Sequence, residues 1–311
     1  AASSLKTRAR VLTVSVVILL AAFVLSSCGG GSSSGSSSGE KRTTRTEFLS
    51  PSASGSTVWS NGDVSVDASN ISEGYIMVKY SGSANKIKIQ LTGPDGNTYT
   101  YTSYTGDYQT FPITAGSGDY KIDVLEQVQG TMYFLALSQN FSVSITDEFS
   151  PFLYPNQYVW YTASSKAVEK GKELSDKSSN DLSYVENVYS YVIKNVKYDE
   201  DKAANIAVDY IPTIDETLET KKGICFDYAS LMSAMLRSQG VPTNLVIGYS
   251  GSAYHAWISV YLSETGWVDN IIEFDGTEWS LMDPTLASNN SSSSVEKYIG
   301  DGNNYMPKFY H

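Results

Sequence analysis

Three residues in the second half of the chain have the types and the order of a thiol-based acyl-transfer site. Cys225 precedes an apolar helical run, His255 lies in His255-Ala256-Trp257, and Asp283 lies in Asp283-Pro284-Thr285. A cysteine nucleophile needs a base that takes its proton, and the base needs a third group that orients it. Only two histidines occur, and the other, His311, is the last residue of the sequence, so the choice of base is almost forced.

The position of Cys225 favours a reactive thiol. We predict a helix over 225–238, with Gly240 and Pro242 as stop signals after it. Unpaired N–H groups and the positive dipole end at a helix N-terminus stabilise a thiolate, and Gly223 permits a tight turn before the helix. Asp227 opposes this in part, because a carboxylate in the first turn favours the neutral thiol. A buried, inert cysteine is the alternative for Cys225 taken alone.

The two other candidates are expected at strand ends. His255 opens a predicted strand over 255–262, and Asp283 follows one over 278–282 and precedes a proline, so its carboxylate can emerge at a sheet edge. Alone, His255 could be an ordinary hydrogen-bonded residue and Asp283 a turn aspartate. The three residues together indicate a catalytic site more specifically than any one of them does alone.

Residues 1–28 have the layout of an export signal. Three basic residues precede an apolar run over 11–25, which is shorter than the roughly 20 residues of a membrane span. The run ends in Leu25-Ser26-Ser27-Cys28, which resembles a bacterial lipobox and implies cleavage before Cys28 and lipid attachment to its thiol. The alternative is an uncleaved anchor helix with an incidental cysteine. The Gly- and Ser-rich stretch that follows predicts a flexible tether over 29–50.

Residues 51–147 have a pattern typical of short antiparallel strands. Polar and apolar residues alternate over 87–91, and turn signals such as Gly93-Pro94-Asp95-Gly96 separate segments rich in β-branched and aromatic residues. We therefore predict a β-sandwich domain here. A group of tyrosines could form a sugar-stacking face, although strand packing is the favoured interpretation; these are Tyr99, Tyr101, Tyr104 and Tyr108.

Residues 148–311 change to a mixed pattern of helices and strands. Ser183 to Glu186 reads as a capping box that starts a helix, and 213–216 predicts a shorter one. The acidic run 199–201 lacks the alternating ligands of a calcium loop and is interpreted as a solvated loop. We expect no metal and no cofactor. The net charge of −11 argues against nucleic acid as a partner, because phosphate binding needs a basic surface.

Several motifs over about 150–300 together resemble the bacterial transglutaminase-like superfamily. They are Gly223-Ile224-Cys225-Phe226-Asp227-Tyr228-Ala229, Leu236-Arg237-Ser238-Gln239-Gly240-Val241-Pro242, Gly248-Tyr249, His255-Ala256-Trp257 and Asp283-Pro284-Thr285. The resemblance implies a papain-like α+β core, in which a central helix carrying the cysteine packs on an antiparallel sheet. It also implies that Cys225 is the nucleophile, His255 the general base and acid, and Asp283 the orienter. Tyr198, in the family's segment between helices, is a further candidate as an oxyanion donor.

These residues predict acyl transfer through a thioester. Water as acceptor would make a protease or amidase, and an amine would make a cross-linking enzyme; the peptidase-like character of exported family members favours hydrolysis slightly. The expected substrate is a protein or peptide, which could be associated with the cell wall. The expected location is the outer face of a bacterial membrane, to which a lipid on Cys28 would anchor the protein. The alternative is a catalytically silent binding or adhesion module that uses the sandwich.

Overall fold

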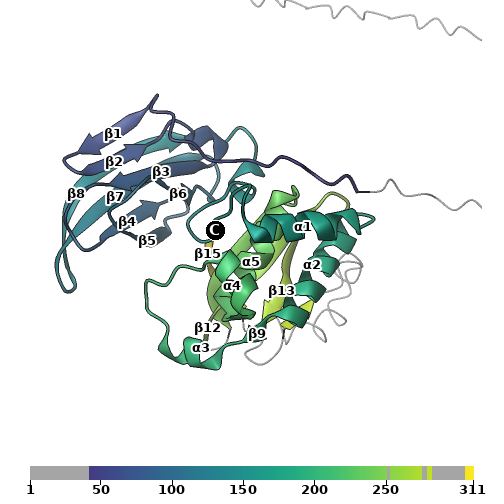
Figure 1. Ribbon diagram of the computed structural model, residues 1–311. Helices are drawn as coiled ribbons and strands as arrows, with labels where there is room; N and C mark the ends of the chain where they lie inside the picture. Colours follow the sequence, from purple (N-terminus) through teal and green to yellow (C-terminus); the bar gives the residue numbers. More distant parts are fainter. Residues whose placement is uncertain (1–41, 251–252, 275–278, 282–304) are drawn as a thin grey trace, which may run out of the picture. The chain divides into compact units, whose positions relative to one another are not determined.

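The computed structural model describes residues 42–250, 253–274, 279–281 and 305–311 (Figure 1). Cys28 and Asp283 lie outside these residues. The elements described below all belong to one compact unit, Gly39–His311.

The first part of this unit consists of two four-stranded antiparallel sheets. One has the order β1-β2-β3-β6 and the other β5-β4-β7-β8. Their bounds are β1 Val58–Asn61, β2 Val64–Asp67, β3 Tyr75–Tyr80, β6 Gln109–Pro112, β5 Thr98–Ser103, β4 Ile87–Thr92, β7 Gly118–Gln129 and β8 Met132–Val143. A short 3-10 turn, Ile71–Glu73, precedes β3, and a second, Ser150–Phe152, follows β8. The predicted antiparallel strands are confirmed.

The core of this part follows the period-two pattern of the sequence. In β4, Ile87, Ile89 and Leu91 are buried while the residues between them are half-exposed, as expected for a strand with one face in a core. Tyr99 and Tyr101 of β5 are buried in the same core. The favoured interpretation of these two tyrosines as strand packing is therefore confirmed.

Within its described residues, the second part combines five α-helices with a five-stranded antiparallel sheet of order β14-β13-β12-β11-β15. The helices are α1 Lys166–Asp176, α2 Asp181–Asn195, α3 Glu200–Asn205, α4 Ile214–Thr220 and α5 Cys225–Ser238. The strands are β11 Thr243–Ser250, β12 Ala253–Leu262, β13 Gly266–Phe274, β14 Trp279–Leu281 and β15 Tyr305–Tyr310. Two short strands, β9 Lys197–Tyr198 and β10 Lys222–Gly223, form a separate parallel pair. The predicted α+β class is confirmed.

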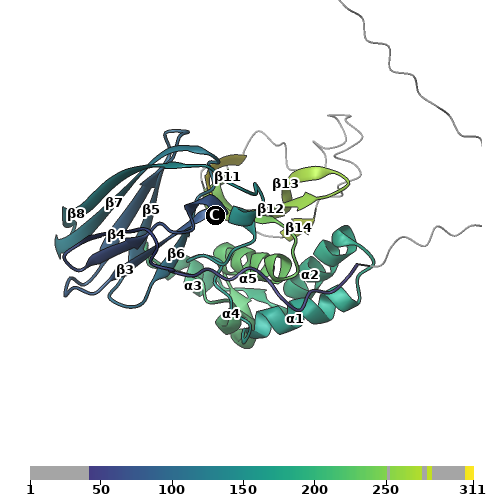
Figure 2. The ribbon, with the colours of Figure 1, turned by 90° about the horizontal axis from the view of Figure 1, so that it is seen from above.

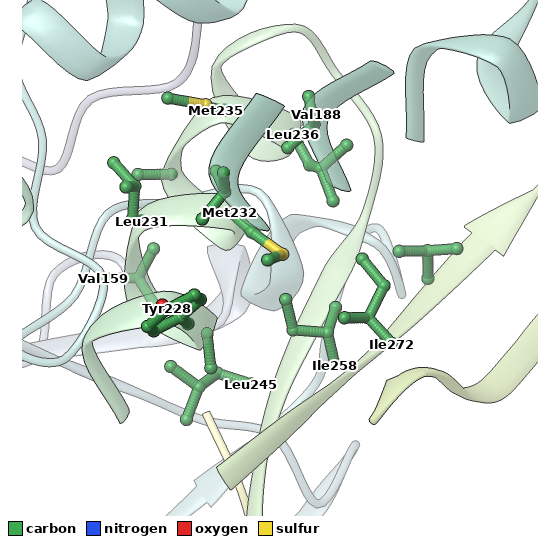
Figure 3. Close-up of a cluster of buried hydrophobic side chains, with 14 of the residues drawn as sticks. Val159, Val188, Tyr228, Leu231, Met232, Met235, Leu236, Leu245, Ile258 and Ile272 are labelled. Atoms are coloured by element: carbon green, nitrogen blue, oxygen red, sulfur yellow. The ribbon is translucent and has the colours of Figure 1, made fainter. Parts of the chain in front are cut away.

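Helix α5 lies at the centre of this part. It packs on α1, α2 and α4 and on strands β11 and β12, so that helices and sheet enclose it (Figures 1 and 2). Figure 3 shows Leu231 and Met232 of α5 among apolar side chains from α2 and from the strands, such as Val188, Leu245 and Ile258. The prediction of a central, buried helix over 225–238 is confirmed at both ends.

Two details of the helices differ from the sequence prediction. Helix α2 begins at Asp181, because Asn180 and not Ser183 is its cap: Asn180 Oδ1 accepts from the Ser183 amide at 2.8 Å, and Ser183 Oγ accepts from the Asn180 amide at 3.1 Å. The acidic run 199–201 is not a loop. Asp199 caps α3 by accepting from the Lys202 amide at 2.9 Å, and the next two residues form its acidic first turn.

The predicted tether 29–50 enters the described residues at Arg42, and its end is held against the helices. The Arg42 amide donates to Ser179 O at 2.8 Å, and Arg42 Nε donates to Ser175 Oγ at 3.1 Å. Arg45 N donates to Gln239 Oε1 at 2.9 Å. Residues 42–45 are therefore not a free linker, because they hydrogen-bond to polar partners in α1, between α1 and α2, and directly after α5.

The two parts contact each other through polar and aromatic side chains. Gln157 Nε2 donates to Thr102 O at 2.8 Å, and Thr114 Oγ1 donates to Tyr310 O at 2.8 Å. The His311 ring is buried beside Tyr101, whose hydroxyl lies 3.0 Å from Nδ1. These contacts could not be predicted from local sequence patterns, because their partners are far apart in the chain.

His311 makes stability depend on pH. Burial, together with the nearby Arg237 cation, lowers its pKa from 6.5 to about 3. Between about pH 6.5 and pH 3 the His311 imidazole binds a proton in the unfolded chain but not in the folded chain. Stability therefore falls as the pH drops from about 6.5 toward 3. We expect the wild type to lose about 2 kcal/mol more than His311→Gln between pH 6.5 and pH 5. Denaturant unfolding of both proteins at the two pH values measures this; equal losses would contradict it.

Candidate active site

The short parallel pair β9–β10 places Cys225 at the N-terminus of α5. The Lys197 amide donates to Lys221 O at 2.9 Å, and the Asp199 amide donates to Gly223 O at 3.0 Å. Ile224 is extended, and helical geometry begins at Cys225. A Cβ on Gly223 would lie 2.7 Å from Asp227 Cβ, so glycine is needed here for close approach of the first helical turn.

Cys225 and His255 line the same cavity, of about 490 Å³. Cys225 is a free thiol and is 9% exposed, while His255 on β12 is half-buried. Other parts of the lining come from the segment that follows α3 and from one strand of the sandwich. These residues are Ile206, Ala207, Val208, Tyr210 and Thr100. The structure therefore places the thiol and the imidazole on the lining of a common cavity.

Opposing effects act on the thiol, and together they raise its pKa. Burial raises the pKa of Cys225 above its usual value, and the Asp227 carboxylate raises it further. Hydrogen bonds from the backbone of Ala256 and of Phe226 lower the pKa. Ala256 follows His255 directly, so the β12 backbone that carries the base also reaches the sulfur. This donor on β12 was missed from the sequence, because a backbone contact across the fold leaves no residue signal.

Asp227 is fully buried below the thiol and carries a small polar network. It accepts from the Ile224 amide at 2.8 Å and forms an ion pair with Lys202 at 2.8 Å. It also accepts from the Tyr210 hydroxyl, which in turn accepts from Lys202 Nζ at 2.6 Å. Asp227 therefore stabilises the N-terminal end of the helix. Lys202 and Tyr210 were not predicted, since nothing in their local sequence indicates a buried partner.

Tyr198 lies near the thiol. Its backbone is held in β9 beside Gly223 of β10. Burial raises the pKa of Tyr198 to about 12, and the Cys225 charge is the next contribution, as expected for two neighbouring groups. Its hydroxyl therefore keeps its proton near neutral pH. Of the sequence candidates, the structure brings together Cys225, His255 and Tyr198, while Asp283 lies outside the described residues.

Comparison with known proteins agrees with this geometry. The sequence model of the Transglutaminase-like superfamily matches residues 169–270, from α1 to β13, which include Tyr198, Cys225 and His255. UPF0252 protein MJ1282 of Methanocaldococcus jannaschii is 36% identical over 117 residues, which are 33% of this chain and 33% of that protein. A Protein-glutamine gamma-glutamyltransferase of Pseudomonas aeruginosa is 31% identical over 68 residues, 17% of this chain and 10% of that protein.

Among solved structures, a protein from Cytophaga hutchinsonii assigned as a cysteine protease aligns with 76% of this chain and 83% of its own, at 13% identity and a TM-score of 0.36. The chain spans a third or less of the curated relatives named above. The family match and the arrangement of α5 on its antiparallel sheet give one conclusion: residues 169–270 form a domain of the transglutaminase-like superfamily.

Replacing the carboxylate below the thiol tests the electrostatic balance. In Asp227→Asn the charge that raises the pKa of Cys225 is lost, so we expect the pH midpoint of Cys225 alkylation to move to lower pH. Lys202 loses its partner, and we expect a loss of about 2 kcal/mol in stability. Iodoacetamide rates across pH and a melting curve measure both effects.

The matched control is Asp201→Asn, an exposed carboxylate in the first turn of α3. It should leave the alkylation midpoint unchanged. A midpoint in Asp227→Asn that stays in place or rises would show that the carboxylate does not act on the thiol.

Proposed function

We propose that this protein is an exported enzyme that transfers acyl groups from protein or peptide amides through a thioester on Cys225. The observation that carries the proposal is the free thiol at the N-terminus of α5 in one cavity with His255. The helix end and the backbone donors around the sulfur stabilise the thiolate, so the pKa of Cys225 is lower than burial alone would make it.

The reaction divides into two steps. His255 takes the thiol proton, the sulfur attacks the amide carbonyl, and the C–N bond breaks as His255 returns the proton to the leaving amine. Water, or a second amine, then attacks the thioester and releases Cys225. The Cys225 amide and the Tyr198 hydroxyl are the proposed donors to the oxyanion. Asp283 is the proposed orienter of His255, on the order of the residues in the sequence.

The lining of the cavity favours a substrate whose acyl group is apolar. Ile206, Ala207 and Val208 line it, and the side chain of Val208 is fully exposed. An exposed apolar segment beside a nucleophile favours a substrate with an apolar residue near the scissile amide. Hydrolysis is the proposed outcome. Transamidation results instead when an amine, and not water, attacks the thioester.

The location is proposed from the sequence of residues 1–28. A basic segment, an apolar run and Leu25-Ser26-Ser27-Cys28 support export and lipid attachment at Cys28. Within the part of the chain that the structure describes, no helix has the length and apolarity to cross a membrane.

A silent binding module is the second candidate, and one observation favours it. Burial raises the pKa of Cys225, which is the environment of an inert core cysteine. The two functions differ in the reactivity of the thiol, which can be measured directly.

The test uses the full chain with Cys28→Ser, so that Cys225 is the single thiol. We expect iodoacetamide to label Cys225 faster than free cysteine at pH 7, and a peptide amide to leave an acyl group on it that mass spectrometry detects. Cys225→Ala should give neither signal, and His255→Asn should slow acylation by about 10²–10⁴-fold. Release of acid or of an amine-coupled product from the acyl-enzyme decides between hydrolysis and transamidation. A thiol that labels no faster than free cysteine and forms no acyl-enzyme would establish the silent module.

The oxyanion role is tested with Tyr198→Phe. Loss of one donor to the oxyanion should lower the acylation rate by about 10²-fold, while the melting temperature stays close to that of the wild type. Tyr133→Phe, a partly exposed tyrosine of the sandwich, is the matched control and should react at the wild-type rate. Equal rates for the two variants would remove Tyr198 from the mechanism.

A further inference from the structure

A second cavity, of about 370 Å³, lies between strand β6 and the segment that leads into α4. It is separate from the thiol cavity, although the two have neighbouring walls: Gln157 lines this cavity and Tyr158 lines the other. Residues 211–215 close one side of it and Trp160 lies on its lining. Nothing in the acyl-transfer chemistry uses these groups.

Two residues that line this cavity each carry a buried polar atom with no hydrogen-bond partner among the described residues. These atoms are Thr110 Oγ1 and Gln157 Oε1, on side chains that are 1% and 6% exposed. The Gln157 amide is fixed in orientation, because Nε2 donates to Thr102 O at 2.8 Å and to Gln109 Oε1 at 2.9 Å. Its Oε1 is therefore a pure acceptor. A buried polar atom without a partner costs about 1–3 kcal/mol, so these two atoms call for an occupant that hydrogen-bonds to them.

The remaining lining sets the chemistry of the occupant. Asp215 places a carboxylate at the cavity, with oxygens that accept from the Lys166 and Ala167 amides at 3.0 Å and retain further acceptor sites. Trp160 is 44% exposed, an unusual exposure for so large a ring. These acceptors and the Asp215 carboxylate disfavour an anion and favour a ligand rich in hydrogen-bond donors. An exposed indole adds a preference for an apolar face.

We propose that this cavity binds a pyranose unit of a glycan. A pyranose has hydroxyls that donate to Gln157 Oε1 and Asp215 and that both donate to and accept from Thr110 Oγ1. Its C–H face is the apolar surface that packs on Trp160. A cavity of this size holds one sugar ring with part of its neighbour, within the range of small-ligand sites.

The experiment measures binding of defined disaccharides to the full chain by saturation-transfer NMR and by titration of tryptophan fluorescence. The probes are cellobiose, maltose, mannobiose and N,N′-diacetylchitobiose, so that acetylated and plain sugars are told apart, and sorbitol is the open-chain polyol control. We expect at least one disaccharide to bind with a Kd below about 10 mM and sorbitol not to bind.

Two variants locate the site. Trp160→Ala should weaken binding by about tenfold or more. Thr110→Val should weaken binding while leaving the melting temperature of the free protein equal or higher, because it removes a buried hydroxyl without a partner. A merely structural threonine would show no loss of binding. Trp267→Ala, a 37% exposed tryptophan on β13, is the matched control and should bind as the wild type does.

Iodoacetamide labelling of Cys225 in the same samples separates this proposal from the proposed enzyme function, since Trp160→Ala should label at the wild-type rate. Failure of all four disaccharides to bind, or equal binding by wild type and Trp160→Ala, would overturn the glycan site and leave the cavity to water.

Discussion

Two buried charges hold the ends of α5, and the rest of this domain is arranged around them. A helix enclosed on all sides cannot leave its N-terminal amides to water. At the N-terminus, Asp227 accepts from the Ile224 amide. At the other end, the buried Arg237 guanidinium donates to the carbonyls of Thr243, Tyr154 and His311, at 2.6–3.0 Å. Burial lowers the pKa of Arg237 to about 10, so it stays charged near neutral pH.

These contacts connect the helix to segments far away in the chain. Tyr154 lies in the connection after the sandwich, Thr243 opens β11, and His311 follows β15. One side chain therefore fixes the connection, the first strand and the last strand of the sheet relative to α5. Because β11 pairs with β12, with Gly248 opposite His255, the strand that Arg237 contacts is also the neighbour of the strand that carries the base.

The elements that carry Cys225 and His255 were predictable from the sequence, because they rest on local pattern. The apolar run after Cys225 and the stop signals near Gly240 gave α5 at both ends, and the alternation after His255 gave β12. Long-range pairing was not predictable. Tyr210 and Lys202 gave no sign that they would meet Asp227, and the start of α2 was misplaced because Ser183 fits either the cap or the third position. Capping patterns leave such ambiguity whenever two polar residues lie three apart.

The segment between α3 and α4 shows why the sandwich matters to the site. Asp209 in this segment accepts from Lys86 Nζ at 2.9 Å and from the Tyr104 hydroxyl at 3.0 Å, both on the sandwich. The hydrogen bond from Lys86 and, to a smaller extent, that from Tyr104 lower the pKa of Asp209. The Asp209 carboxylate is therefore charged at neutral pH. Residues before Tyr210 line the thiol cavity, and residues after it line the second cavity. A segment of this length without regular structure has little stability of its own. The sandwich therefore supplies the contacts that hold the wall between the two cavities, and it takes part in the site instead of only spacing it from the N-terminus.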